Sequence, residues 1–148
     1  MIIEGIIFDW IGVLSAGSKG GVYPYSRRVL KELKPRYKLG LVSLAGFGSE
    51  KRLRDIDESG LRDYFDSIVV DTTKTIEHYL RCIEELKVAP ETTLIVDDRT
   101  IRGISIGNRL GCKTCWVMEQ KYLHETPNGK TGEPTYRIKS AEDLLSII

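Results

Sequence analysis

The sequence predicts an α/β protein with a doubly wound, mostly parallel sheet. Five runs of apolar, β-branched residues recur along the chain, and they are nearly continuous rather than alternating, as in strands buried on both faces. Segments with helical spacing separate these runs, so strand and helix alternate from end to end. Such alternation is typical of right-handed crossovers between parallel strands, with helices on both faces of the sheet. The predicted strands are 2–8, 38–42, 67–70, 93–96 and 113–118.

Four of the five predicted helices have a start or stop signal. Proline is tolerated in the first turn of a helix, serine caps the N-terminus well, and glycine commonly follows the last turn. Pro24, Ser49 and Ser140 supply the starts, and Gly60 and Gly111 supply stops. The turn-rich segment 124–134 is predicted to be a surface loop. The predicted helices are 24–36, 49–60, 75–88, 100–111 and 140–148.

Length and charge exclude several classes of protein. The chain has 148 residues, which suits a single domain over residues 1–148. Its net charge of +1 gives no electrostatic case for nucleic acid or an anionic membrane as the main partner. No apolar run approaches the roughly 18–20 residues of a membrane span, and the N-terminal residues lack the pattern of an export signal. We therefore expect a cytoplasmic protein, and the sequence does not predict its oligomeric state.

Three cysteines are present, and two of them form a C-x-x-C pair, Cys112 and Cys115. An odd number of cysteines argues against a disulfide framework. A redox pair favours a helix N-terminus, where the thiol pKa is lowered, but this pair enters an apolar run that has the pattern of a strand. We expect ordinary packing in a strand, with a redox, disulfide or metal role as the alternative.

Polar residues stand where the predicted strands end. Asp9 follows the first strand, Ser43 the second, and Asp97 and Asp98 the fourth, while Lys74 comes shortly after the third. Ligands of an open parallel sheet bind at the carboxyl ends of its strands. Each residue alone has an ordinary structural explanation, such as a turn, a cap or a solvated lysine. Together they predict one site at this edge of the sheet.

The chemistry of this set is that of phosphoryl transfer. Carboxylates that lie close together repel and need a cation, and a hard ion such as Mg²⁺ takes oxygen ligands. A lysine and a hydroxyl group nearby suit the oxygens of a phosphate. Metal-assisted phosphoryl transfer, with an aspartate as the nucleophile, uses this combination of groups.

The order of these elements resembles the haloacid dehalogenase-like (HAD) hydrolase superfamily. Its first signature is a strand that ends in D-x-D-G-[TV]-L, and here the stretch is DWIGVL, from Asp9. A strand-end Ser or Thr, a Lys ahead of a helix and a strand-end acidic pair follow in the family's order, here as Ser43, Lys74 and VDDRT. The resemblance covers nearly the whole chain and implies a HAD-like, Rossmann-type core.

The resemblance also implies roles for the matching residues. Asp9 would attack phosphorus and become an aspartyl phosphate, while Ser43 and Lys74 would hold the phosphate oxygens.

The metal site is implied in the same way. Mg²⁺ would be bound by the Asp9 carboxylate, the backbone carbonyl of Ile11 and Asp98. Asp97 would orient Lys74 or a water molecule on the metal.

One position departs from the family's pattern. The phosphatases usually carry at position 11 the aspartate that protonates the leaving oxygen and then activates water, and this chain has Ile11. General acid–base catalysis contributes roughly 10²–10⁴-fold, so cleavage of alkyl phosphates should be much weakened. Leaving groups that need no proton, such as those of acyl or aryl phosphates, should suffer less. A member that binds phosphate, metal or a protein partner without catalysis is the alternative.

Two further classes are disfavoured by the order and spacing of the motifs. Dehalogenases of this superfamily use no metal and need a helical cap, but the intervals between the motifs leave no room for a substantial cap. A receiver domain would place its acidic pair after the first strand and its aspartate after the third, which is a different order. Capless relatives often act on large or macromolecular phosphorylated substrates, and we expect the same here.

Overall fold

The computed structural model describes residues 2–17 and 19–148. In that part of the chain, six parallel strands form one sheet in the order β3-β2-β1-β4-β5-β6. This arrangement confirms the predicted α/β class and parallel sheet. The strands are β1 (Gly5–Phe8), β2 (Lys38–Leu44), β3 (Ser67–Asp71), β4 (Thr93–Asp97), β5 (Lys113–Val117) and β6 (Tyr136–Ile138).

Four α-helices connect the successive strands from β1 to β5, and a fifth follows β6. The α-helices are α1 (Ser26–Leu33), α2 (Ser49–Ser59), α3 (Ile76–Leu86), α4 (Ser105–Leu110) and α5 (Leu144–Ile147). A π-helical turn, η3 (Thr100–Ile104), leads directly into α4. Short 3₁₀ turns are η1 (Arg62–Tyr64), η2 (Pro90–Thr92), η4 (Gln120–Tyr122) and η5 (Ala141–Asp143). None of the helices in the described residues is both long enough and apolar enough to cross a membrane.

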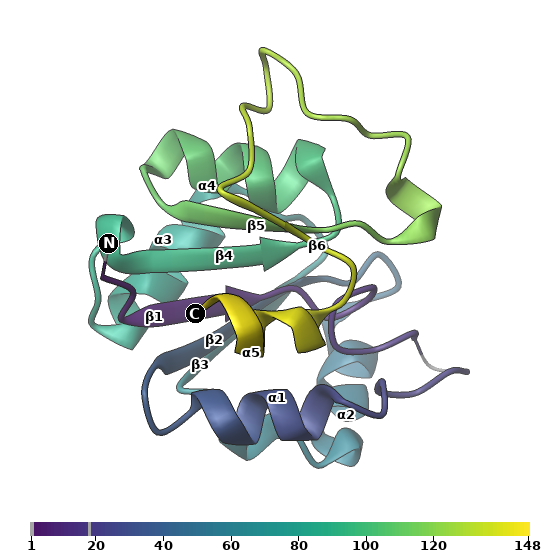
Figure 1. Cartoon of the computed structure of the whole chain (residues 1–148). Helices are drawn as coiled ribbons and strands as arrows, with labels where there is room; N and C mark the ends of the chain where they lie inside the picture. Colours follow the sequence, from purple (N-terminus) through teal and green to yellow (C-terminus); the bar gives the residue numbers. More distant parts are fainter. Residues whose placement is uncertain (1, 18) are drawn as a thin grey trace.

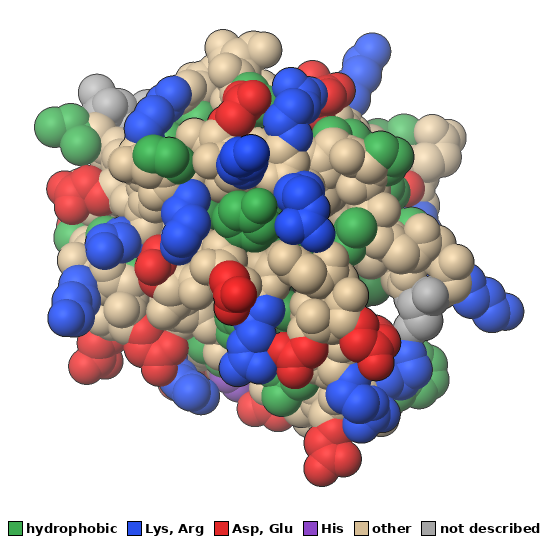
Figure 2. Space-filling model, turned by 90° about the horizontal axis from the view of Figure 1, so that it is seen from below, with side chains coloured by type: hydrophobic (Ala, Val, Ile, Leu, Met, Phe, Trp, Pro, Cys, Tyr) green, Lys and Arg blue, Asp and Glu red, His purple; other side chains and the backbone are tan. Residues whose placement is uncertain are grey.

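The two faces of the sheet carry separate apolar clusters, because successive strand side chains point to opposite faces. Ile6 and Phe8 of β1 belong to the cluster that α1, α2 and α5 cover. Ile7, between them, belongs to the cluster that α3 and α4 cover. Figure 1 shows α1 and α5 in front of the sheet and α3 and α4 behind it. Basic and acidic side chains are interspersed on the face seen in Figure 2.

The cysteines are buried and free. Cys115 lies in β5 and packs in the cluster under α1, whereas Cys112 packs in the cluster under α3. Burial raises the pKa of both thiols to about 12. A thiol that stays protonated is a poor nucleophile and metal ligand, so the geometry favours packing over a redox role.

The structure corrects two predictions about single elements. Ser49 is the first residue of α2 rather than its cap, because Gly48, with a φ of 116°, precedes the helix and Ser49 bonds the carbonyl of Val70 instead. β6 was not predicted, since three residues after a turn-rich loop give too short a pattern to recognise. The Ser140 cap is present, with Asp143 completing a capping box.

No cap covers the carboxyl edge of the sheet within the described residues. The connection between β1 and α1 is a loop over 9–25, where Ser15 bridges Ile11 and Val22. The connection between β2 and β3 holds α2 and η1, which pack against the sheet.

Candidate active site

The sheet register places the carboxylates of two neighbouring strands at one level. Phe8 pairs with Val96 of β4, and the Asp9 amide donates a hydrogen bond to the Val96 carbonyl at 3.0 Å. Asp9 and Asp97 are therefore adjacent at the point where β1 and β4 end. The Asp98 side chain, from the residue after β4, lies at the same edge.

Three carboxylates meet there. Asp9, Asp97 and Asp98 each offer an oxygen atom, and these atoms all lie within 4.8 Å of one another. Burial raises the pKa of Asp9 to about 6, against the lowering effect of the nearby lysine. The pKa of Asp98 is raised further, first by burial and then by the charges of Asp9 and Asp97. Asp9 and Asp98 thus resist being ionised together, as carboxyl groups that share one site do.

Lys74 is the one cation in direct contact with this cluster among the described residues. Its Nζ lies 3.1 Å from Asp9 Oδ1 and 3.2 Å from Asp97 Oδ2, and its side chain is 2% exposed. Burial would lower the pKa of Lys74, but Asp9 and Asp97 outweigh it and raise the pKa well above its usual value. Lys74 is therefore a fixed charge that joins the ends of β1 and β4.

Asp97 is held by backbone amides as well as by Lys74. Its Oδ1 accepts from the Arg99 amide at 3.1 Å and its Oδ2 from the Gly103 amide at 2.8 Å. Burial alone would raise the pKa of Asp97, yet the charge of Lys74 and the hydrogen bonds from Asp98 and the Arg99 amide lower it. The π-helical turn brings Gly103 so close that a Cβ there would lie 2.2 Å from Asp97 Oδ2. Single π-turns of this kind are frequent at functional sites.

Asp98 packs under the turn that follows Asp9. A Cβ on Gly12 would lie 2.2 Å from Asp98 Oδ2, and the φ of Gly12 is +85°, so glycine is required there on both counts. The indole Nε1 of Trp116 donates to the Asp98 carbonyl at 3.0 Å, which fixes the backbone on the other side.

Ser43 is buried, and its partner was not predicted. Arg52, from the first turn of α2, donates to the Ser43 hydroxyl at 2.5 Å and to the Leu44 carbonyl at 3.0 Å. Asp9 lies close enough to raise the pKa of Arg52, although burial has the larger, lowering effect. A cation in the first turn of a helix opposes the helix dipole. Lys51 stands in the same turn, so this conflict alone does not single out Arg52 in the sequence.

A small pocket of about 70 Å³ opens over the cluster. It is lined by Asp9, Ile11, Leu44, Arg52, Lys74, Asp98, Arg99, Arg102 and Tyr122. Ser43 does not line the pocket itself, but it accepts a hydrogen bond from Arg52, which does. Three arginines and a lysine around so small a space make the pocket suited to an anion.

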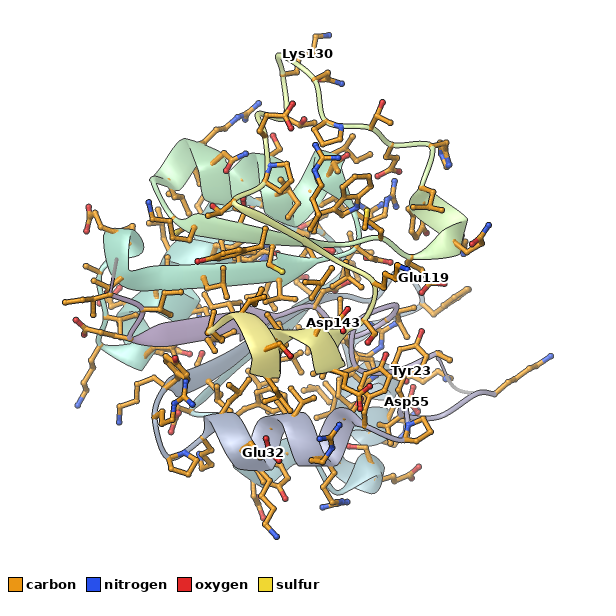
Figure 3. The ribbon with its side chains drawn as sticks, viewed as in Figure 1. Tyr23, Glu32, Asp55, Glu119, Lys130 and Asp143 are labelled. Carbon is orange, nitrogen blue, oxygen red and sulfur yellow. The ribbon has the colours of Figure 1, made fainter. Side chains whose placement is uncertain are left out.

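The segment after β5 contributes Tyr122 to this pocket. The sequence predicted only a surface loop in this part of the chain, over 124–134. Arg99 Nε lies 2.8 Å from Glu125 Oε2, and its guanidinium stacks over the Tyr122 ring at 4.0 Å from the centroid. The Thr100 hydroxyl also donates to the Glu125 carbonyl at 2.7 Å. The tip of the loop, at Lys130, projects away from the body of the molecule as expected of a surface turn (Figure 3).

The donor set suits a hard divalent ion. Asp9 and Asp98 supply carboxylate oxygens, and both of their pKa values are raised by burial and by neighbouring negative charge. Lys74 offers one positive charge against three carboxylates, so a further cation would relieve the repulsion. Oxygen ligands with no nitrogen or sulfur among them are typical of Mg²⁺. The residues therefore fit the ion that the sequence motifs imply.

Solved structures of other proteins share this fold. An uncharacterized protein from Listeria monocytogenes serotype 4b superimposes with a TM-score of 0.79 at 17% identity, over 99% of this chain and 100% of that one. A putative β-phosphoglucomutase from Thermotoga maritima gives 0.75 at 18%, over 98% of both chains. At these identities the likeness shows the fold alone.

A third structure is nearer in sequence. The putative HAD-hydrolase YfnB from Bacillus subtilis, a structure bound to magnesium, superimposes with a TM-score of 0.73 at 25% identity, over 87% of this chain. This chain spans only 57% of YfnB. No match was found among curated proteins.

Residues 14–117 match the family described as haloacid dehalogenase-like hydrolase, so the chain belongs to that family. The match begins at Leu14, so it does not include Asp9 and Ile11 of the first motif.

Proposed function

We propose that this protein is a Mg²⁺-dependent phosphatase or phosphotransferase that works through an aspartyl phosphate on Asp9. The observation that supports this most is the contact of Lys74 with both Asp9 and Asp97, at the edge where Asp98 completes a carboxylate cluster. Lys74 keeps Asp9 ionised and aimed at the pocket. An ionised carboxylate is the form that attacks phosphorus.

The cationic side chains divide the work of holding the phosphate. Lys74 and Arg52 line the pocket and would bind the non-bridging oxygens, and Ser43 would hold Arg52 in place through its hydroxyl. Asp97 keeps Lys74 in position through their 3.2 Å ion pair. Mg²⁺ would be held by Asp9, Asp98 and the Ile11 carbonyl, and it supplies positive charge that offsets the repulsion between the phosphate and the carboxylates.

The chemistry favours substrates whose leaving group needs no proton. No acid stands at position 11, so the leaving oxygen must depart as an anion, as in aryl and acyl phosphates. The pocket is not covered by a cap in the described residues, which suits large phosphorylated substrates. Free, buried cysteines are compatible with a reducing compartment, and we propose that the protein acts in the cytoplasm.

The test is phosphate release by the purified protein from p-nitrophenyl phosphate and acetyl phosphate. We expect release that requires Mg²⁺, stops on chelation and is lost in Asp9→Asn. The matched control is Asp63→Asn, which removes an exposed carboxylate outside the site and should retain activity. Release that persists in Asp9→Asn, or that ignores Mg²⁺, would contradict the proposal.

Ile11 favours one second candidate, a protein that binds phosphate and Mg²⁺ without turnover. Without an acid or base at position 11, a phosphate ester bound at the cations of the pocket would stay uncleaved. Calorimetry that shows phosphate binding only with Mg²⁺, together with no release from either substrate, would support this second candidate over the first.

A further inference from the structure

A larger groove adjoins the pocket over Asp9. It has a volume of about 490 Å³, and two of its lining residues, Ile11 and Arg52, also line the small pocket. The groove is therefore continuous with the site of reaction. Asp55, another lining residue, lies at the edge of the molecule toward which the strands point (Figure 3). The remaining lining residues are Gly17, Ala45, Phe47, Gly48 and Lys51.

One wall of this groove is apolar. Ile11 is partly buried against the core under α1, and Ala45 is buried. Phe47, in the loop between β2 and α2, is 97% exposed, the highest exposure among the large hydrophobic side chains described. A phenylalanine ring that stays exposed to water lacks most of the hydrophobic stabilisation that its burial would give. A ring bound between Ile11 and Phe47 would bury both side chains.

Resting on the function proposed above, we propose that this groove binds the aromatic leaving group of an aryl phosphate monoester. The bond from Asp9 to phosphorus forms as the bond from phosphorus to the aryl oxygen breaks. The electron pair stays on that oxygen, and the phenolate then takes a proton from water. Arg52 lines both the pocket and the groove, so the positive charge that would hold the phosphate also favours a leaving group that departs as an anion.

The residue at position 11 links the apolar wall to the chemistry. A phenol has a pKa of about 10, whereas an aliphatic alcohol is close to water, at about 15.7. A phenolate therefore leaves without the acid that Ile11 replaces. An acyl phosphate also needs no acid, but its small carboxylate leaving group would bury little of Ile11 or Phe47. The groove thus distinguishes aryl phosphates from acyl phosphates with a small leaving group, such as acetyl phosphate.

Two non-hydrolysable probes test binding apart from turnover. Benzylphosphonate carries a ring in place of the leaving group, and methylphosphonate does not. By calorimetry with Mg²⁺ present, we expect the benzyl compound to bind roughly tenfold tighter or more. Phe47→Ala should remove most of that difference and leave methylphosphonate binding unchanged. Leu80→Ala, which truncates an exposed leucine on α3, is the matched control and should change neither affinity.

Kinetics separate this inference from the function on which it rests. Phe47→Ala should raise KM for phenyl phosphate several-fold and leave kcat/KM for acetyl phosphate unchanged. Equal affinity for the two phosphonates, or equal losses on both substrates, would overturn the aryl groove while acetyl phosphate turnover still supported the phosphatase. If neither phosphonate binds and neither substrate is cleaved, both proposals are wrong, and the exposed Phe47 would then serve another contact.

Discussion

Replacing Ile11 by aspartate tests the consequence of the missing acid. Ile11 lines both the pocket over Asp9 and the adjoining groove, so a carboxyl group at this position would face the leaving oxygen. General acid catalysis is worth roughly 10²–10⁴-fold, or about 3–5 kcal/mol of barrier. We expect Ile11→Asp to raise kcat/KM for an alkyl phosphate such as glycerol phosphate by that range.

The gain should depend on the leaving group. Phenyl phosphate needs little protonation, so its kcat/KM should change far less, and the ratio of alkyl to aryl activity should rise. Ile11→Asn is the matched control, because it has nearly the same shape as aspartate and loses the same apolar packing but carries no proton. Thermal melting of both variants would show the shared cost of losing a partly buried isoleucine.

The comparison of the two variants is decisive. If Ile11→Asp is no faster than Ile11→Asn on glycerol phosphate, with both folded and both binding phosphate, the missing acid is not what limits this site. If both substrates gain equally, the new carboxylate acts by another route, such as a change in metal binding.

Three further perturbations follow from the cluster. Gly103→Ala would place a Cβ at 2.2 Å from Asp97 Oδ2. It should lower the free energy of unfolding, measured in urea, by about 1–3 kcal/mol and should also lower activity. The control Gly129→Ala, at a position with open space around it, should change neither. Lys74→Met leaves the carboxylates without their cation and should abolish activity, and a variant that keeps phosphate release would contradict the assigned role. Without Mg²⁺, the pKa of Asp9 is about 6 in the folded protein and 3.8 in the unfolded chain. This difference stabilises the folded protein fully below about pH 4, and the stabilisation is lost as the pH rises through 6. Mg²⁺ should therefore raise Tm more at pH 8 than at pH 5, and an equal rise would count against metal binding at the carboxylates.

The parallel sheet was predictable because burial on both faces leaves a strong local pattern. The runs that became β1, β2, β3, β4 and β5 are continuous and β-branched, and the strand starts were placed within a few residues. β6 has only three residues, and it pairs with β5 after a long loop. Just before it, the amides of Thr114 and Thr135 each donate to the other residue's hydroxyl oxygen. Nothing local in the sequence marks such a strand.

The residues at the strand ends were predictable for a different reason. Parallel strands bring their carboxyl ends to one edge, so Asp9, Asp97 and Asp98 had to meet once the topology was known. Arg52 and Tyr122 were not predicted, since one depends on the rotation of α2 and the other on how the loop after β5 folds back. Both depend on contacts between residues far apart in the sequence. The loop after β5 folds back to the site because Arg99 and Glu125 form an ion pair across 26 positions.

The identity of the nucleophile can be measured directly. The protein would be mixed with acetyl phosphate and Mg²⁺, quenched in acid and digested, and the peptides analysed by mass spectrometry. We expect a phosphoryl group on Asp9, long-lived because Ile11 provides no base to hydrolyse it, and absent from Asp9→Asn. Phosphate release without any phosphoryl group on the peptide that contains Asp9, or with the group on another residue, would contradict the central claim.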